Sequence, residues 1–337
     1  MSFVFFGEVM LRLTPSQPHA LLVASDSLSV DFAGAEANVA ANLSHLGHDC
    51  NMVSVFPNNL IGDKAISVMS KYGISTEGCS RDEHRIGTYF IELGYSVRPT
   101  KVVYDRADSS FAALSAASFN WDSILNNAST LFVGGITLAL SEQCRLATLE
   151  AVKTAKRRGV KVVFDMNFRR SLWDNWQDAN RYFSEILEYT DLVFGNAGVM
   201  SDVFSFTFNS SDSALESTKA SMEILANQFD VDIAFTVRQQ SDASSNILQA
   251  VYKPSSGDKY QVSAEVRVGV LDRLGTGDAF AAGMLHGLAK YSDLQQAIDF
   301  ANAAFALSHT QYGDQNLCSE TDILSIAQGN TSGYVIR

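Results

Sequence analysis

The chain is poor in the residues that build covalently linked or metal-stabilised folds. Its 337 residues include only four cysteines, at positions 50, 79, 144 and 318, with no Cys-x-x-Cys pair and no matching histidine spacing. Neither a disulfide framework nor a structural metal site is therefore expected, and no residue is assigned as a metal ligand. A reducing, cytoplasmic setting is the expectation that follows.

Basic charge is also scarce. The chain has 37 acidic and 25 basic residues, a formal net charge of -12, and the charges are spread without long runs of one sign. This balance argues against the broad basic surface that nucleic-acid binding requires. A small anion could still bind in a local basic pocket.

Long apolar runs and a dinucleotide-type glycine motif are missing as well. The apolar stretch over residues 3–6 is interrupted by Glu8 and Arg12 before a signal peptide or membrane span is complete, so no membrane association is expected. The stretch instead predicts a first strand. It is followed by Gly7-Glu8-Val9 rather than Gly-x-Gly-x-x-Gly, which disfavours a dinucleotide-binding oxidoreductase.

From about residue 130 onward, short apolar runs alternate with segments of helical periodicity. A helix is predicted over residues 141–158, opening on Ser141 and closing before Gly159. Helix-then-strand repeats indicate a single α/β domain over residues 1–337, with a mostly parallel central sheet flanked by helices and ligands at the carboxyl ends of its strands. The predicted strands of this part are residues 131–133, 161–164, 192–194 and 233–237.

The segment before residue 115 has a different pattern. Two β-rich runs, residues 86–91 and 101–106, flank a turn and have no helix between them, which predicts an antiparallel hairpin. The period of two puts Tyr104 and Arg106 on one face of the second strand. They could reach a ligand together, or they could belong to an ordinary solvated face.

The most informative segment is a glycine-rich turn that opens into a helix. Gly275-Thr276-Gly277-Asp278 precedes apolar residues at helical spacing. Backbone N–H groups at such a helix start, together with the helix dipole, suit a phosphate or the negative charge of phosphoryl transfer. Asp278 could cap the helix, or it could accept a proton from a hydroxyl that attacks the phosphate.

A second turn of small residues leads into a helix after Gly34. Asn38, near the start of this helix, could bind sugar hydroxyls through its amide or could satisfy local backbone groups. Two arginines, Arg106 and Arg169, suit a carboxylate ligand that accepts paired charged hydrogen bonds. Arg169 could instead face ATP phosphates or a surface carboxylate.

These motifs resemble those of the ribokinase (PfkB-type) family of carbohydrate kinases. The segment around Asp272 and Asp278 is similar to the second family signature, with Thr276 in place of the usual alanine. Residues 31–47 are similar to the first signature, with Ala33 in place of a glycine. Further likeness at residues 7–13, 104–107 and 165–169 narrows the resemblance to the 2-keto-3-deoxygluconate kinase branch.

The resemblance implies a ribokinase-like fold with a small β-sheet lid, formed by about residues 9–33 and 85–112. It implies ATP-dependent phosphorylation of 2-keto-3-deoxygluconate at its 6-hydroxyl, with Mg2+ on the phosphates and a monovalent cation such as K+ as a further candidate. A homodimer or larger homo-oligomer, built partly on the lid strands, is also implied.

The same resemblance assigns the site residues. Catalysis would use Asp278, Gly275, Thr276 and Gly277; the sugar would contact Gly34, Asn38, Tyr89, Tyr104, Arg106, Ile136, Arg169 and Asp278; ATP would contact Asn167, Arg169, Asn196, Gly275 and Gly277.

The sequence is also compatible with other acceptor sugars and with a function other than catalysis. The acceptor could be fructose, ribose or a related keto-sugar, because the fold and catalytic loop do not select it. A sensor of the same fold that binds sugar or nucleotide without catalysis is disfavoured by the intact Asp278. Residues 238–243 lack the glycines usual in the family, which predicts a loop that approaches the nucleotide less closely.

Overall fold

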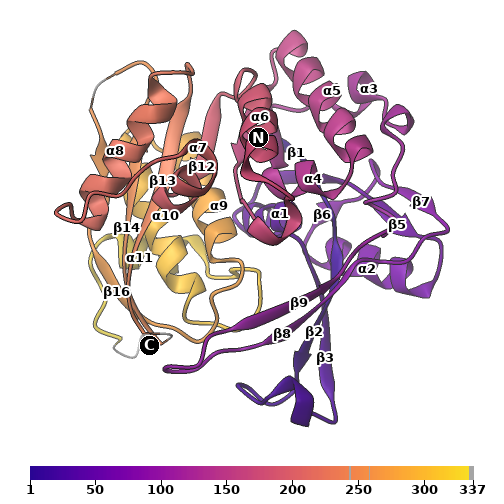
Figure 1. Cartoon of the computed structure of the whole chain (residues 1–337), viewed down its shortest axis with the longest axis horizontal. Helices are drawn as coiled ribbons and strands as arrows, with labels where there is room; N and C mark the ends of the chain where they lie inside the picture. Colours follow the sequence, from indigo (N-terminus) through magenta and orange to yellow (C-terminus); the bar gives the residue numbers. More distant parts are fainter. Residues whose placement is uncertain (243, 258, 334–337) are drawn as a thin grey trace.

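The computed structural model describes residues 1–242, 244–257 and 259–333, and its centre is one large, mostly parallel sheet (Figure 1). Its strands are β1 (Ser2–Phe6), β4 (Asp49–Val53), β6 (Ile74–Ser75), β10 (Thr130–Gly134), β11 (Lys161–Asp165), β12 (Leu192–Gly195), β13 (Asp232–Asp242), β14 (Ser245–Lys253), β15 (Gln261–Val262) and β16 (Val266–Gly269). The order is β15-β14-β13-β12-β11-β10-β1-β4-β6, with β16 also paired to β14. Strands β14, β15 and β16 form the antiparallel edge.

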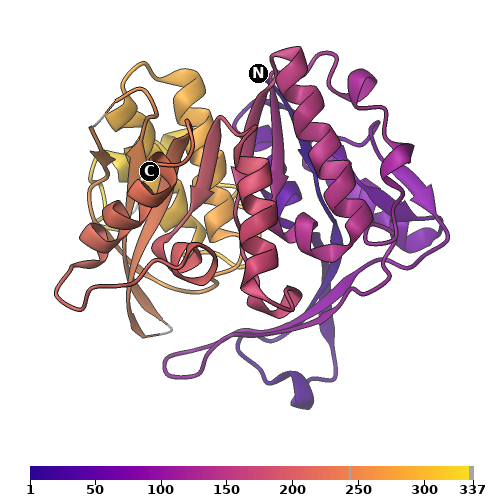
Figure 2. The same ribbon diagram turned by 45° about the horizontal axis from the view of Figure 1, so that its top comes forward.

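Helices cover both faces of this sheet, as Figure 2 shows. One face is covered by α1 (Ala35–His45), α2 (Leu60–Lys71), α9 (Thr276–Lys290) and α10 (Leu294–Ser308), with α11 (Glu320–Ala327) packed on α10. The other is covered by α3 (Trp121–Ile124), α4 (Gly135–Leu140), α5 (Glu142–Arg158), α6 (Trp176–Leu187), α7 (Ala197–Phe204) and α8 (Ala214–Ala226). Short 3-10 turns lie at Leu22–Ala24, Ala116–Ser118 and Arg170–Leu172. Among the described residues, no helix is both long and apolar enough to cross a membrane.

Strand β1 shows how the sequence places this sheet in the interior. Phe3 and Phe5 pack into the core on one face, and Val4 and Phe6 pack into the core on the other. Each is at most 2% exposed. A continuous apolar run is therefore needed, because a parallel strand covered by helices has no solvent face.

A smaller sheet projects from the large one and runs beneath the C-terminal half of the chain (Figure 1). It contains β2 (Met10–Pro15), β3 (Leu28–Ala33), β8 (Thr88–Glu92) and β9 (Lys101–Asp105), in the order β3-β2-β8-β9. Strands β8 and β9 form the expected antiparallel hairpin, with Tyr89 opposite Tyr104. A separate pair joins β5 (Val55–Pro57) to β7 (Ser80–Asp82).

The fold class expected from the sequence is confirmed, as are the predicted strands and the helix that opens on Ser141 and ends at Gly159 in the left-handed conformation. One prediction is wrong. The strand expected to end near Val237 continues to Asp242, because Arg238 and Gln239 pair with Leu248 and Ile247 of β14. Residues 238–242 are therefore strand rather than loop, and Ala243 lies outside the described residues.

Candidate active site

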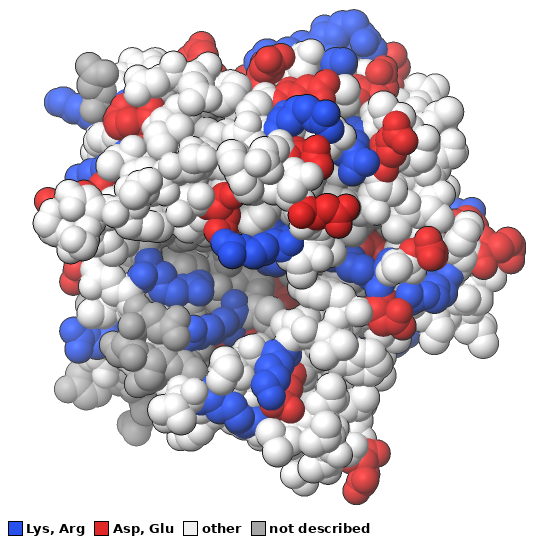
Figure 3. Space-filling view, in the orientation of Figure 1, with Lys and Arg blue, Asp and Glu red and all other residues white. Residues whose placement is uncertain are grey.

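A cavity of about 920 Å³ opens where the carboxyl ends of the parallel strands meet the smaller sheet. Much of its lining comes from the ends of β11, β12 and β13 and the loops after them, and ligands of open α/β sheets bind at the carboxyl ends of the strands. Figure 3 shows the hollow with basic side chains gathered around it. The cavity lining brings together all the site residues expected from the sequence: Gly34, Asn38, Tyr89, Tyr104, Arg106, Ile136, Asn167, Arg169, Asn196, Gly275, Thr276, Gly277 and Asp278.

The turn before α9 is shaped by glycine. Gly275 has φ 69°, and a Cβ there would lie 1.8 Å from the carbonyl oxygen of Asp314, so a larger residue does not fit. Gly277 differs, because a Cβ there would meet nothing within 4 Å. The space beside Gly277 is open toward the cavity, which leaves room for a ligand against the backbone.

Three helices that begin at the cavity share an unusual start. The N-cap residues of α1, α4 and α9 are Gly34, Gly134 and Gly275, and none has a side-chain cap. The other α-helices of the described part of the chain are each capped by a side chain, such as Asn59 at α2 or Ser141 at α5. First-turn N–H groups of α1 and α9 are therefore left for a ligand in the cavity.

Asp278 lies in the first turn of α9 and is almost buried, with 8% exposure. Asn38 Nδ2 donates a hydrogen bond to its Oδ2 at 2.7 Å, and Asn38 Oδ1 accepts one from Gln315 Nε2 at 3.0 Å. Burial raises the pKa of Asp278 well above the ordinary carboxyl value, and nearby Asp165 adds to this rise, while the Asn38 hydrogen bond opposes it. A carboxylate with a raised pKa is a stronger base, which suits proton abstraction near neutral pH.

The position of Asn38 refines the role expected for it. Its amide was expected to bind sugar hydroxyls or local backbone. Its Oδ1 does accept a long hydrogen bond from the backbone N–H of Gly34 at 3.4 Å, but its shorter bonds are to side chains 240 and 277 residues away in the sequence. One amide N–H remains for a ligand. Asn38 therefore orients Asp278 and can contact a bound sugar at the same time.

A buried ionic network, which the sequence analysis missed, joins the smaller sheet to the α9 turn. Arg12 of β2 lies 2.9 Å from Asp272 Oδ2 and 2.8 Å from Asp314 Oδ2. The Tyr89 hydroxyl of β8 donates to Asp314 Oδ2 at 2.9 Å. An arginine on the buried face of an apolar strand was the available signal, since buried charges are almost always paired. The network holds the α9 turn in register with β2 and β8.

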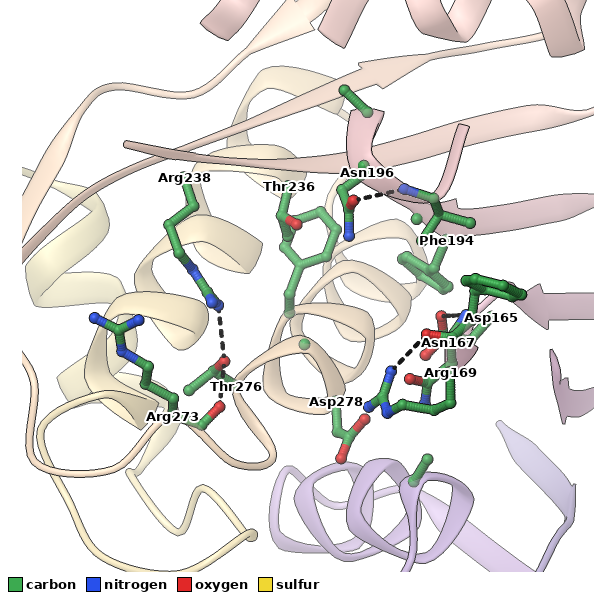
Figure 4. Close-up of a pocket in the computed structure, with 18 of the residues that line it drawn as sticks. Asp165, Asn167, Arg169, Phe194, Asn196, Thr236, Arg238, Arg273, Thr276 and Asp278 are labelled. Atoms are coloured by element: carbon green, nitrogen blue, oxygen red, sulfur yellow. Dashed lines mark hydrogen bonds between the residues drawn. The ribbon is translucent and has the colours of Figure 1, made fainter. Parts of the chain in front are cut away.

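The two arginines expected to bind a carboxylate have different surroundings. Arg106 is buried and donates from Nε to Glu8 Oε2 at 2.9 Å, so its charge is already compensated. Arg169 follows β11, is exposed, and has no carboxylate at ion-pair distance among the described residues. Figure 4 shows its guanidinium directed toward Asp278. Arg169 is thus the more available of the two for an anionic ligand.

The loops after β11 and β12 supply polar groups at the other side of the cavity. Asn167 has φ 30°, a left-handed conformation that asparagine tolerates, and its backbone N–H donates to Asp165 Oδ1 at 3.1 Å. Burial raises the pKa of Asp165 to about 6, opposed by Arg169. Asn196 caps α7 through Oδ1, which leaves its amide N–H groups for a ligand.

Glu36 is a further buried carboxyl group, located beneath the cavity at 2% exposure. Its side chain fills the space beside Gly7 and Gly134 and accepts a hydrogen bond from Thr137 Oγ1 at 3.3 Å. Burial raises its pKa from 4.5 to about 7. Between these two pH values the Glu36 carboxyl group is ionised in the unfolded chain but stays protonated in the folded protein. The free energy of unfolding therefore falls as the pH rises through this window.

Replacing Glu36 with glutamine should therefore remove a pH-dependent loss of stability. The variant should unfold at a temperature roughly 2–4 °C above the wild type at about pH 8, and the difference should shrink toward zero below about pH 4.5. Thermal melts across this pH range measure it. Glu77→Gln, at an exposed position, is the matched control and should show no such trend. A pH-independent difference would show that the Glu36 carboxyl does not titrate as described.

Comparison with protein families places almost the whole chain in one of them. Residues 2–322 match the family described as pfkB family carbohydrate kinase. The chain belongs to this family. A crystal structure of 2-dehydro-3-deoxygluconokinase from Thermotoga maritima is similar at 34% identity and a TM-score of 0.93, covering 98% of both chains. A PfkB family carbohydrate kinase from Listeria grayi is similar at 30% identity and a TM-score of 0.88, over 97% of this chain and 100% of that one.

A relative of similar length is named as a kinase of a related type. The 2-dehydro-3-deoxygalactonokinase of Haloferax volcanii is 29% identical over 330 residues, which is 98% of each chain. This pfkB protein is therefore a carbohydrate kinase, and its resemblance to the family, its fold and its enzyme class are confirmed together.

Proposed function

We propose that this pfkB kinase transfers the γ-phosphoryl group of ATP to the 6-hydroxyl of 2-keto-3-deoxygluconate, with Asp278 as the base. One observation carries the proposal: the nearly buried Asp278 carboxylate lies beside the uncapped N-terminus of α9, with the exposed Arg169 directed toward it. The candidate base, the anion-binding backbone amides and an arginine that suits an acidic substrate therefore all line one cavity.

The chemistry follows from this arrangement. The sugar oxygen attacks the γ-phosphorus as its proton passes to the Asp278 carboxylate, and the bond from that phosphorus to the β-phosphate oxygen breaks to release ADP. Backbone N–H groups of residues 275–277 stabilise the charge that develops on the transferring oxygens. Asn38 keeps the carboxylate in position throughout.

The metal requirement is consistent with the residues present. Among the residues described, no group of three or more His, Cys, Asp or Glu is placed to hold a metal ion. Mg2+ would therefore be held mainly by the ATP phosphates and water, where it neutralises phosphate charge. A monovalent cation such as K+ would compete with Arg12, which already forms ion pairs with Asp272 and Asp314 beside the α9 turn.

The acceptor assignment depends on Arg169 and on the relatives. The Thermotoga and Haloferax proteins are named for 2-dehydro-3-deoxy acids, which carry a carboxylate. An exposed guanidinium in the cavity suits that group, whereas fructose or ribose would not need it. 2-Keto-3-deoxygalactonate, which the Haloferax name favours, is the second candidate acceptor.

Replacing Arg169 with glutamine tests the acceptor class. We expect kcat/KM for 2-keto-3-deoxygluconate to fall roughly 10- to 100-fold through loss of a charged hydrogen bond, while any rate with fructose or ribose stays unchanged. Coupled ADP release with a panel of acid and neutral sugars measures both. Arg157→Gln, at a surface ion pair with Asp122, is the control. Equal losses on acid and neutral sugars would contradict carboxylate binding by Arg169.

The smaller sheet would act as a lid that excludes water from the reaction. The tip of the β8–β9 hairpin touches the opposite side of the molecule, where Ser96 N donates to Ser244 Oγ at 2.8 Å. Exposed apolar side chains on this sheet, Val30 at 61% and Val103 at 55%, favour a homodimer built on the lid strands. A cytoplasmic location accords with the four free cysteines.

A further inference from the structure

Strand β13 carries side chains into the nucleotide end of the cavity. Thr236, Val237 and Arg238 all line it, but Val237 is only 3% exposed and packs in the core cluster on one face of the sheet. The backbone of Arg238 is held by pairing with Leu248 of β14. A strand with this pairing aims its side chains in fixed alternating directions, which a flexible loop would not do. Arg238 is thus directed into the cavity by the sheet itself.

The guanidinium of Arg238 reaches the first turn of α9. Its NH2 group donates to Thr276 Oγ1 at 3.2 Å, and the Thr276 hydroxyl in turn donates to the carbonyl oxygen of Arg273 at 3.0 Å. Arg273 also lines the cavity. Figure 4 shows both arginines on one side of Thr276, with Asp278 on the other. The catalytic carboxyl and this arginine pair therefore lie on opposite sides of the same turn.

The two arginines place positive charge close together. Desolvation of the guanidinium in the cavity, together with the nearby charge of Arg273, lowers the pKa of Arg238 to about 10, although the residue as a whole is exposed. Burial and these two arginines also lower the pKa of His309 to about 3. Within the described ranges, Arg238 has no carboxylate at ion-pair distance. Mutual repulsion of this kind is relieved by a bound anion.

We propose that Arg238 and Arg273 bind the polyphosphate chain of the nucleotide, against the open amides of the α9 turn. The proposal rests on the proposed kinase function and names the side chains that take the phosphates. It also reverses the expectation for residues 238–243, because the glycine-poor segment brings a charged group closer to the nucleotide rather than withdrawing from it. Guanidinium groups match phosphate geometry through several N–H donors at once.

An alternative role for Arg238 is contact with the base of the nucleotide. Its Cζ lies 5.3 Å from the centroid of the Phe305 ring, and arginine can also stack on bases. Binding to the ring of Phe305 leaves the N–H groups at the guanidinium edge directed toward Thr276 and the α9 turn, where the phosphates belong. The geometry therefore favours phosphate.

Calorimetric binding without sugar tests the proposal. We expect Arg238→Gln and Arg273→Gln each to weaken ADP binding roughly 10- to 100-fold and to leave adenosine binding unchanged. Arg238→Lys, which keeps the charge, should recover part of the ADP affinity. Arg267→Gln is the matched control, since Arg267 is exposed on β16 and outside the cavity. Thermal melts confirm that each variant is folded.

The outcomes separate this proposal from the kinase assignment. Equal weakening of ADP and adenosine by Arg238→Gln would mean a base contact and would overturn the phosphate role. Unchanged ADP affinity in both glutamine variants would also overturn it, while wild-type binding and turnover of ATP would leave the proposed function standing. If the wild-type protein bound neither ADP nor ATP, the proposed function itself would fail.

Discussion

Replacing Asp278 with asparagine is expected to lower kcat by roughly 10²–10⁴-fold, the usual contribution of a general base. Asparagine has nearly the same shape and can still accept the hydrogen bond from Asn38 Nδ2. It cannot take the proton of the attacking hydroxyl. Sugar and ADP affinities measured by calorimetry should therefore stay within a few-fold of wild type, and coupled ADP release at saturating substrates measures the loss.

The pH profile adds an independent check on Asp278. Because burial raises its pKa, the wild-type rate should fall with decreasing pH at a higher pH than an ordinary carboxylate would give. This acid limb should disappear from the residual rate of Asp278→Asn. Asp122→Asn, at an exposed position on α3, is the control. A kcat equal to wild type in Asp278→Asn would end the assignment of this residue as the base.

The buried pair of Arg106 and Glu8 should produce the largest loss of stability. Changing Arg106 to glutamine leaves the Glu8 carboxylate buried without its cation, and we expect the free energy of unfolding to fall by about 3–5 kcal/mol. Urea unfolding measures this. The double variant Glu8→Gln with Arg106→Gln should recover much of the loss, because it removes both charges rather than one.

A surface pair provides the comparison. Arg157→Gln breaks an exposed ion pair with Asp122 and should change the free energy of unfolding by about 0–1 kcal/mol. An equally small effect of Arg106→Gln would mean that water reaches the Arg106–Glu8 pair. The pair also bears on substrate binding. Because Glu8 already pairs with Arg106, Arg106 is less available than Arg169 to bind the carboxylate of an acid sugar. Removal of Arg169 should therefore weaken the binding of acid sugars directly.

Much of this architecture could be predicted because its signals are local. The helix from residue 142 to 158 carries its own cap at Ser141 and its own stop at Gly159, and each glycine turn leads directly into the helix that it begins. Cavity residues such as Asn167 and Asn196 come directly after buried strands, so their meeting follows from the parallel sheet.

The parts that could not be predicted depend on distant partners. The polar run after Val237 has no strand pattern of its own, and it is extended because β14 offers a ladder of hydrogen bonds. Arg12 and Asp272 are 260 residues apart in the sequence, and Asn38 and Asp278 are 240 apart. No spacing rule connects such pairs. They are recognised only once the two segments lie against each other.

Helices α1 and α9 both begin after a glycine N-cap, and this affects how the cavity binds anions. A peptide dipole has no proton to gain or lose and does not depend on which side chain follows. The attraction for anions that these two helix starts provide should therefore be constant across pH and should survive the removal of every arginine in the cavity. The side chains around these helix starts can then differ between enzymes that act on different sugars, while the backbone continues to provide affinity for phosphate.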